Sequence, residues 1–181
     1  MNIPALPPKM MHMKRDKRGF PIPFVQFIVP ETGEPDFRVV DQSKAAKAIA
    51  QRLCAICGKK MGAHVFFIGG PKCVENGYFI DGPVHLECGQ FALRTCPHLA
   101  RSKGRYSQAS KPDTAEQLIV DLDVVDPNKV TTFALMKSTR YHTETMDGYP
   151  VIKAKMPWKA VQWWCDGKPL RKDEPAVTDM D

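Results

Sequence analysis

Cys54-Ala-Ile-Cys57-Gly58 is followed further along the chain by His85-Leu-Glu-Cys88, and these two stretches decide the fold. Each carries two metal-binding side chains separated by two residues. Zinc takes four such ligands at tetrahedral positions, thiolates at about 2.3 Å and imidazole nitrogens at about 2.0 Å. A Cys-x-x-Cys turn can place both sulfurs on one ion, and His-x-x-Cys on a helix puts its ligands one turn apart. The pattern predicts a structural zinc site formed by Cys54, Cys57, His85 and Cys88.

The residues between the two pairs predict a treble-clef zinc finger. Residues 65–68 and 77–80 have the composition of two short strands, with Gly69-Gly70-Pro71 as their turn. A helix is expected over residues 85–95, because Cys96-Pro97 cannot continue it. The parts of a treble clef are a zinc knuckle, here the turn Cys54–Gly58, then a hairpin, and then a helix that brings the second ligand pair.

Two further cysteines leave the ligand set open. Cys73 lies in the predicted hairpin and is kept as a reserve ligand. Cys96 lies more than two helical turns beyond Cys88, so we interpret it as a core thiol at the helix end. The paired spacings, together with an N-terminus that has no apolar signal sequence, favour metal and reduced thiols over disulfides.

Composition and charge bound the class of protein. The chain has 181 residues, 43% of them apolar, which is enough for one domain with a real core. No apolar run reaches the roughly 18 residues of a membrane helix, and a cytoplasmic protein is expected. Residues 1–112 carry 17 Lys/Arg against 8 Asp/Glu, whereas residues 113–181 carry 9 against 12. A basic half that holds the zinc site makes nucleic acid the first partner to consider, although solubility alone also explains a net charge of +6.

Four regions and an α+β fold class are predicted along the chain. Residues 1–18 are expected to be a flexible basic N-terminal arm, and residues 101–112 a basic linker. Residues 19–100 hold an N-terminal β-hairpin, a helix and the treble-clef zinc module. Residues 113–181 form a small mixed C-terminal unit.

Periodicity places the elements inside these regions. The expected elements are a hairpin of strands 24–29 and 36–40, a helix over 41–53, helix-compatible residues from 114 to 125, and strands 130–136 and 149–154. Residues 157–164 are compatible with a helix or a strand, and Pro157 favours a short helix that ends at Gly167. Asp41 or Ser43 is the predicted N-cap of the helix over 41–53. Its buried face is predicted to be formed by Ala45, Ala46, Ile49 and Leu53.

The chain resembles a family of small uncharacterised bacterial and bacteriophage proteins with this zinc core. The resemblance covers about residues 18–100 and rests on motifs in the same order: Arg18-Gly-Phe-Pro-Ile-Pro-Phe24, Pro35-Asp-Phe-Arg-Val39, Leu53 to Gly62, Gly70-Pro71, Pro83 to Cys88 and Cys96-Pro97. It implies that Cys54, Cys57, His85 and Cys88 hold a metal in a bacterial or phage-infected cytoplasm. It implies no activity.

Three functions remain open. The sequence does not decide whether the protein is an enzyme, but it favours a protein without catalytic activity. The first is a non-enzymatic binding protein that presents a basic surface to nucleic acid through Lys59, Lys60, Lys72, Arg94, Arg101, Lys103 and Arg105. The second is an adaptor or phage factor that binds a host protein through Trp158, Trp163 and Trp164, although such tryptophans are more often core residues. The third is a metal-dependent nuclease of the HNH kind, which would need His85 as its general base although the zinc site also needs that residue.

Overall fold

The computed structural model describes residues 3–100, 131–146 and 149–171. The helices of these residues are short, the longest being α3 with 10 residues, and five consecutive strands follow it. In chain order the elements are η1 Pro8–Met10, β1 Gln26–Ile28, β2 Pro35–Val40, α1 Gln42–Ala50, β3 Val65–Gly69, α2 Pro71–Asn76, β4 Tyr78–Phe79, α3 Leu86–Thr95, β5 Thr132–Ser138, β6 Tyr141–Met146, β7 Tyr149–Ala154, β8 Ala160–Cys165 and β9 Lys168–Pro169. None of the described helices is long and apolar enough to cross a membrane.

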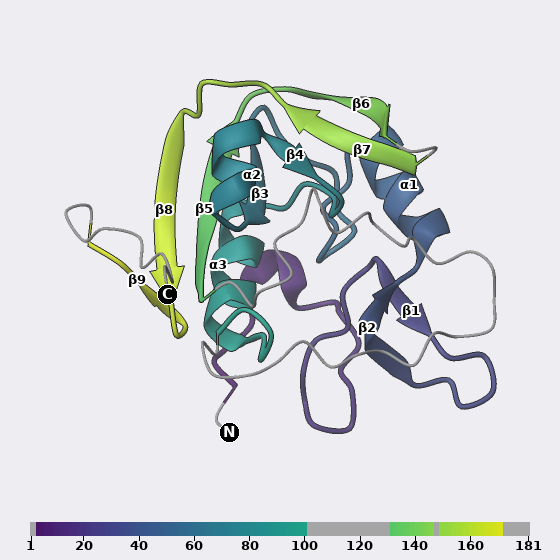
Figure 1. Cartoon of the computed structure of the whole chain (residues 1–181). Helices are drawn as coiled ribbons and strands as arrows, with labels where there is room; N and C mark the ends of the chain where they lie inside the picture. Colours follow the sequence, from purple (N-terminus) through teal and green to yellow (C-terminus); the bar gives the residue numbers. More distant parts are fainter. Residues whose placement is uncertain (1–2, 101–130, 147–148, 172–181) are drawn as a thin grey trace.

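Three antiparallel sheets organise the molecule. Their strand orders are β1-β2, β3-β5-β8-β9 and β4-β7-β6. In Figure 1, β5 and β8 run side by side, α2 and α3 lie against this sheet, and β6 and β7 cross the top. The predicted α+β class is confirmed. The N-terminal hairpin is also confirmed, since β1 pairs with β2.

The predicted hairpin between residues 65–68 and 77–80 is wrong. β3 pairs with β5, and β4 pairs with β7, so the two strands belong to different sheets. The intervening residues form helix α2, which begins with Pro71 and ends at Gly77 in a left-handed conformation with φ +72°. Proline at a first helical position and glycine just past the last one are a start and a stop signal for a helix. The structure therefore keeps the knuckle and the ligand-bearing helix of a treble clef, but not its hairpin.

The C-terminal residues also differ from the prediction. Residues 157–164, predicted as a short helix, contain strand β8, which pairs with β5 along its whole length. Val161, Trp163 and Trp164 suit a pleated surface, and this preference outweighs the helix-start signal of Pro157. Because β5 and β7 pair with β3 and β4, the strands of residues 132–165 share sheets with strands of the region predicted to be the zinc module. The predicted linker over 101–112 and helix over 114–125 lie outside the described residues.

The N-terminal segment does not fit the prediction of a flexible arm over residues 1–18. In its described part, Met10 is buried at 1% exposure and belongs to the main hydrophobic core. The Nζ of Lys9 lies 2.7 Å from a carboxylate oxygen of Glu87, at the start of α3. The ring of His12 donates a hydrogen bond to the carbonyl of Cys57 at 3.0 Å. This segment is therefore bound against both halves of the predicted metal site.

Helix α1 confirms its predicted N-cap. The side chain of Asp41 accepts a hydrogen bond from the backbone N–H of Lys44. The helix ends at Ala50, before the predicted Leu53, and Arg52 has a positive φ of 53°. Its buried residues are Ala45, Ala48 and Ile49, whereas Ala46 is exposed. The helix therefore ends before the Cys54-x-x-Cys57 turn, and Arg52 changes the direction of the chain between them.

Aromatic side chains join the two larger sheets. Phe67 of β3 is fully buried and stacks on Phe79 of β4, with ring centroids 4.6 Å apart. The ring of Tyr141 on β6 is perpendicular to the ring of Phe67, with the two ring centroids 5.8 Å apart. Trp164 is 2% exposed, and the indole N–H of Trp158 donates to the carbonyl of Val74. The tryptophans therefore belong mainly to the core.

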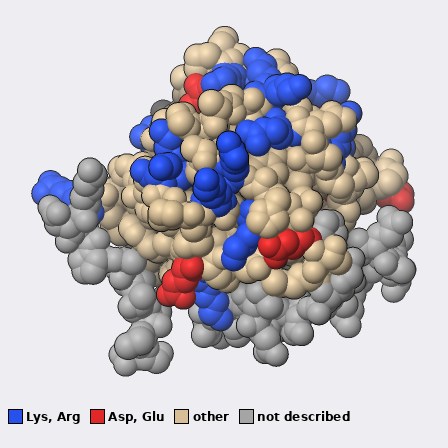
Figure 2. Space-filling model, turned by 90° about the horizontal axis from the view of Figure 1, so that it is seen from above, with Lys and Arg blue, Asp and Glu red and all other residues tan. Residues whose placement is uncertain are grey.

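Basic side chains dominate one end of the molecule. Figure 2 looks down on the end where β6 and β7 lie, and Lys and Arg side chains cover much of it, with few Asp or Glu among them. The strands β6 and β7 at this end belong to the half of the chain that the charge count of the sequence had marked as acidic.

Candidate metal centre

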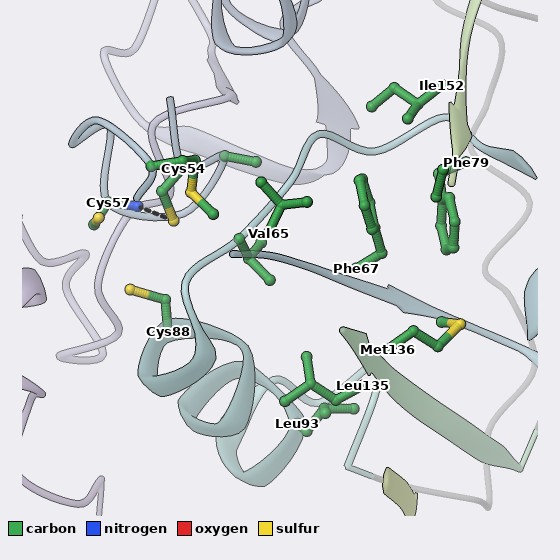
Figure 3. Close-up of a cluster of buried hydrophobic side chains, with 14 of the residues drawn as sticks. Cys54, Cys57, Val65, Phe67, Phe79, Cys88, Leu93, Leu135, Met136 and Ile152 are labelled. Atoms are coloured by element: carbon green, nitrogen blue, oxygen red, sulfur yellow. Dashed lines mark hydrogen bonds between the residues drawn. The ribbon is translucent and has the colours of Figure 1, made fainter. Parts of the chain in front are cut away.

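The four predicted ligands meet in the structure. The ligand atoms of Cys54, Cys57, His85 and Cys88 all lie within 4.8 Å of one another. All four residues are buried, with exposures between 0% and 7%. Figure 3 shows the three cysteine sulfurs pointing toward one another beside the hydrophobic core. The sequence thus identified a buried group of three thiols and one imidazole that can hold a metal ion.

A tight turn positions the first pair. The backbone N–H of Cys57 points at the sulfur of Cys54, 3.5 Å away, and the N–H of Gly58 donates to the carbonyl of Cys54 at 2.8 Å. The N–H of Cys54 donates in turn to the carbonyl of Lys59. An N–H directed at a sulfur stabilises its thiolate form. The turn therefore fixes both sulfurs on one side and favours their ionised state.

The start of α3 positions the second pair. His85 is the N-cap residue of α3, and Cys88 lies in its first turn. Paired hydrogen bonds between Val84 and Phe66 fix the approach to the helix, and the N–H of Ala55 donates to the carbonyl of Pro83. These bonds tie the approach to both the knuckle and β3. The positive end of the helix dipole also favours a negative charge on Cys88.

A hydrogen bond determines which nitrogen of His85 faces the sulfurs. Its Nε2 donates to the carbonyl of Lys60 at 3.1 Å. Nδ1 therefore carries the lone pair, and it lies 3.4 Å from the sulfur of Cys57 and 3.9 Å from that of Cys88. In a tetrahedral zinc site with standard bond lengths, sulfur and nitrogen ligands are about 3.5 Å apart. The distances and the tautomer both suit a metal ligand.

The pKa values of two thiols in the cluster are shifted in opposite directions. Hydrogen bonds from the thiols of Cys57 and Cys88 lower the pKa of Cys54 to about 3. Hydrogen bonds to Cys54 and Cys57, followed by burial, raise the pKa of Cys88. One thiolate is thus stabilised at the expense of its neighbour, because several buried anions repel each other. A divalent cation among the sulfurs would allow all three to ionise, so the donor set fits a metal.

Neither Cys73, the reserve ligand, nor Cys96, the predicted core thiol, belongs to this group. Cys73 lies on α2 and Cys96 at the C-terminal end of α3, and burial raises the pKa of both thiols. His64 and His98 are exposed. Within residues 3–100, 131–146 and 149–171, the four-ligand cluster is the one group of three or more such side chains that could hold a metal.

The predicted nucleic-acid contacts are spread over several elements. Lys59 and Lys60 are exposed beside the knuckle, Lys72 is exposed on α2, and Arg94 is exposed on α3. The guanidinium of Arg94 lies over the ring of Trp164 at 5.5 Å. Arg101, Lys103 and Arg105 lie outside the described residues. The described members of the predicted set thus come from the turn after Cys57, α2 and α3, and whether they form one surface stays a prediction.

Sequence reasoning missed a second group of basic residues. The described residues between 131 and 171 carry seven Lys/Arg and two Asp/Glu. The acidic balance of residues 113–181 comes instead from 113–130, residue 147 and 172–181. A charge count in shorter windows, rather than by half-chain, would have found this group, since residues 137–159 hold five Lys/Arg against two Asp/Glu.

A cavity of about 600 Å³ lies beside Ala55 and Ile56 of the Cys-x-x-Cys turn. It lies between the N-terminal segment, α2 and α3, and its lining is mainly apolar, with Phe20, Ile56 and Phe91 among its walls. None of the four cluster residues lines it. The cavity is therefore separate from the metal centre.

Comparisons with protein families, with curated proteins and with solved structures found no match for this chain.

Replacing Gly58 with Ala tests the knuckle. Gly58 has a φ of +71°, and a Cβ there would lie 2.9 Å from the ring of Phe24. The left-handed conformation alone costs a non-glycine residue about 1–2 kcal/mol. We expect Gly58→Ala to lower the free energy of unfolding by at least about that amount in urea denaturation, and to weaken metal retention against a chelator.

Gly62→Ala is the matched control for the knuckle variant. Gly62 lies four residues further on, and a Cβ there would meet nothing within 4 Å. Its effect on the free energy of unfolding is expected to stay within about 0.5 kcal/mol. Equal effects of the two substitutions would contradict the role assigned to the turn.

Proposed function

We propose that the protein is a zinc-stabilised, non-enzymatic binding protein that presents a basic surface to nucleic acid. The buried Cys54, Cys57, His85 and Cys88 cluster is the observation that carries the proposal. The binding role follows from the charge of the rest of the described chain.

Zinc is the metal that best suits the donor set. Three thiolates and one imidazole are soft or borderline ligands, whereas Mg²⁺ and Ca²⁺ prefer oxygen. Four protein ligands complete a tetrahedron, and their burial leaves little room for a water or substrate on the ion. Bound zinc would supply structural cross-linking between the knuckle and α3. We therefore propose a structural zinc site of treble-clef type in which α2 is inserted and the hairpin is replaced by longer-range pairing.

Nucleic acid is the partner that the charge distribution favours. The described residues carry 20 Lys/Arg against ten Asp/Glu. Surfaces of this kind attract the phosphate backbone and release its counterions on binding. With the resemblance to bacterial and phage proteins, this makes the proposed setting a bacterial cytoplasm.

The two alternatives have less support. An adaptor that uses the C-terminal tryptophans would need them accessible, but Trp164 is buried and Trp158 is hydrogen-bonded to Val74. A nuclease of the HNH kind needs a hairpin between β3 and β4, which belong to different sheets. It also needs His85 as a base, whereas Nδ1 of His85 faces two thiols and Nε2 is bonded to Lys60.

Metal analysis and a binding titration test the proposal together. Native mass spectrometry of the purified chain is expected to show one zinc per molecule. Fluorescence anisotropy with labelled DNA and RNA is expected to show binding that weakens steeply between about 50 and 300 mM salt. A chain without metal would contradict the zinc centre. A metal-loaded chain that binds neither nucleic acid at the lowest salt would contradict the binding role.

A further inference from the structure

We propose that duplex nucleic acid binds through its phosphates to an upper basic face, defined as Lys137, Arg140, Lys155 and Lys159. This inference rests on the proposed function and names the surface that performs it. None of these residues belongs to the contact set predicted from the sequence.

The fold brings the four residues together from the end of β5, which carries Lys137, and from two connections. Arg140 lies between β5 and β6, and Lys155 and Lys159 lie between β7 and β8, at the end of the molecule seen in Figure 2. The N–H of Lys155 donates to the carbonyl of Arg140 at 2.9 Å. The N–H of Lys159 donates to the carbonyl of Lys137, also at 2.9 Å. The two connections are thus held side by side.

Ser138 fixes this arrangement from inside. Its side chain is 1% exposed, and its hydroxyl lies within hydrogen-bond distance of the carbonyls of Arg140, at 3.0 Å, and Lys155, at 2.8 Å. A buried hydroxyl between these two carbonyls keeps the chain segments that carry two like charges at a fixed separation. The backbone positions of Arg140 and Lys155 are therefore set by a buried hydrogen-bonding group.

The charges on this face lack acidic partners. In the described part of the chain, no ion pair involves Lys137, Arg140, Lys155 or Lys159. Arg140, Lys155 and Lys159 are exposed, and Lys137 is half-buried. The nearby Glu144 is already occupied by His142 and Tyr78, at 2.8 and 2.9 Å. A fixed group of like charges without counter-charges creates a positive potential that a polyanion can satisfy.

The surroundings favour phosphate contacts over base stacking or membrane insertion. The exposed large hydrophobic residues in the described chain are Met11, Ile80, Leu86 and Met156, and Met156 alone lies in the connections that form this face. Single-strand binders stack bases on aromatic side chains, and membrane-surface helices insert an apolar face. In these connections Trp158 is half-buried, bonded to the carbonyl of Val74 and packed against Phe79, and no described helix lies there. A duplex offers the denser line of phosphates, so it is the expected ligand.

The double substitution Lys155→Glu/Lys159→Glu tests the face. Both side chains are exposed, so the fold and the metal content should be preserved, as circular dichroism and native mass spectrometry will verify. In anisotropy titrations with a short labelled duplex of mixed sequence, affinity is expected to fall at least about tenfold, and the slope of log K against log salt to shrink by about 2. The wild-type chain is expected to bind the duplex more tightly than the matching single strand.

Lys59→Glu/Lys60→Glu is the matched control, with the same charge change on two exposed lysines beside the knuckle. It is expected to retain most of the wild-type affinity. Loss of binding in this variant alone would overturn the upper basic face and leave the proposed function standing. Failure of the wild-type chain to bind nucleic acid at all would remove both. Binding of anionic phosphatidylserine vesicles without nucleic-acid binding, or a preference for single strands, would also overturn the inference.

Discussion

Cys57→Ser is expected to release the metal and unfold residues 54–97. A structural zinc contributes on the order of 10–16 kcal/mol in finger peptides, whereas whole domains are stable by only about 5–15 kcal/mol. The variant also leaves the remaining thiols and His85 around a site that no longer has four ligands. Loss of the ion should therefore cost more than the module can lose and remain folded.

Contacts around the cluster determine how far the unfolding spreads. The N–H of Ala55 is bonded to Pro83, and Nε2 of His85 is bonded to Lys60. The ion pair between Lys9 and Glu87 joins the N-terminal segment to α3. The first two contacts connect the turn after Cys54 with the start of α3, which the metal would hold together, and the third depends on the position of α3. All three should therefore weaken when the metal leaves.

Metal content and a thermal melt measure this outcome. Cys73→Ser is the control, because Cys73 is a partly buried cysteine on α2 outside the cluster. It is expected to keep its metal and a cooperative melt. The ligand assignment is wrong if Cys57→Ser retains both its zinc and the wild-type melting temperature, or if Cys73→Ser loses its metal.

The cluster of Cys54, Cys57, His85 and Cys88 was predictable because its sequence signal is local. Each ligand pair is defined by two intervening residues, and a turn or the start of a helix is enough to bring both ligands to one side. Asp41 is another local signal, since an N-cap acts on the first turn of its own helix. In contrast, the hydrogen bond from His85 to Lys60 depends on the folded knuckle, and no spacing in the sequence indicates it.

The strand partners were not predictable because they depend on distant residues. Val65 to Gly69 alternate as a strand should, but nothing in these residues shows that they pair with Ala134 to Ser138 rather than with the nearer strand. Pro71 and Gly77 did carry a local helix signal, which the hairpin interpretation overrode. Residues 157–164 gave an ambiguous signal, and long-range pairing with β5 decided it. The upper basic face was not predictable for the same reason, since it forms only when the β5–β6 and β7–β8 connections meet in the fold.

Phe67→Ala is expected to give the largest loss of stability among substitutions away from the metal. Phe67 is fully buried, and its ring contacts Phe79 of β4 and Tyr141 of β6. It therefore joins the sheet that contains β3 to the sheet that contains β4. Truncating a buried phenylalanine costs about 3–5 kcal/mol, because the lost contacts leave a cavity that the neighbours fill incompletely. Urea denaturation with intrinsic fluorescence as the readout gives this free energy.

Phe66→Ala supplies a control at the adjacent position of the same strand. Successive side chains on a strand point to opposite faces, and Phe66 is half-buried on the other side of β3. Its truncation should cost about 1–2 kcal/mol, in proportion to the smaller area it removes from water. Folded Phe67→Ala should still hold one zinc, since the ring contacts recorded for Phe67 involve none of the four ligands. A loss of stability no greater than that of Phe66→Ala would show that the sheets do not depend on this aromatic cluster. A loss of metal from the folded variant would show that the core and the metal centre are one cooperative unit.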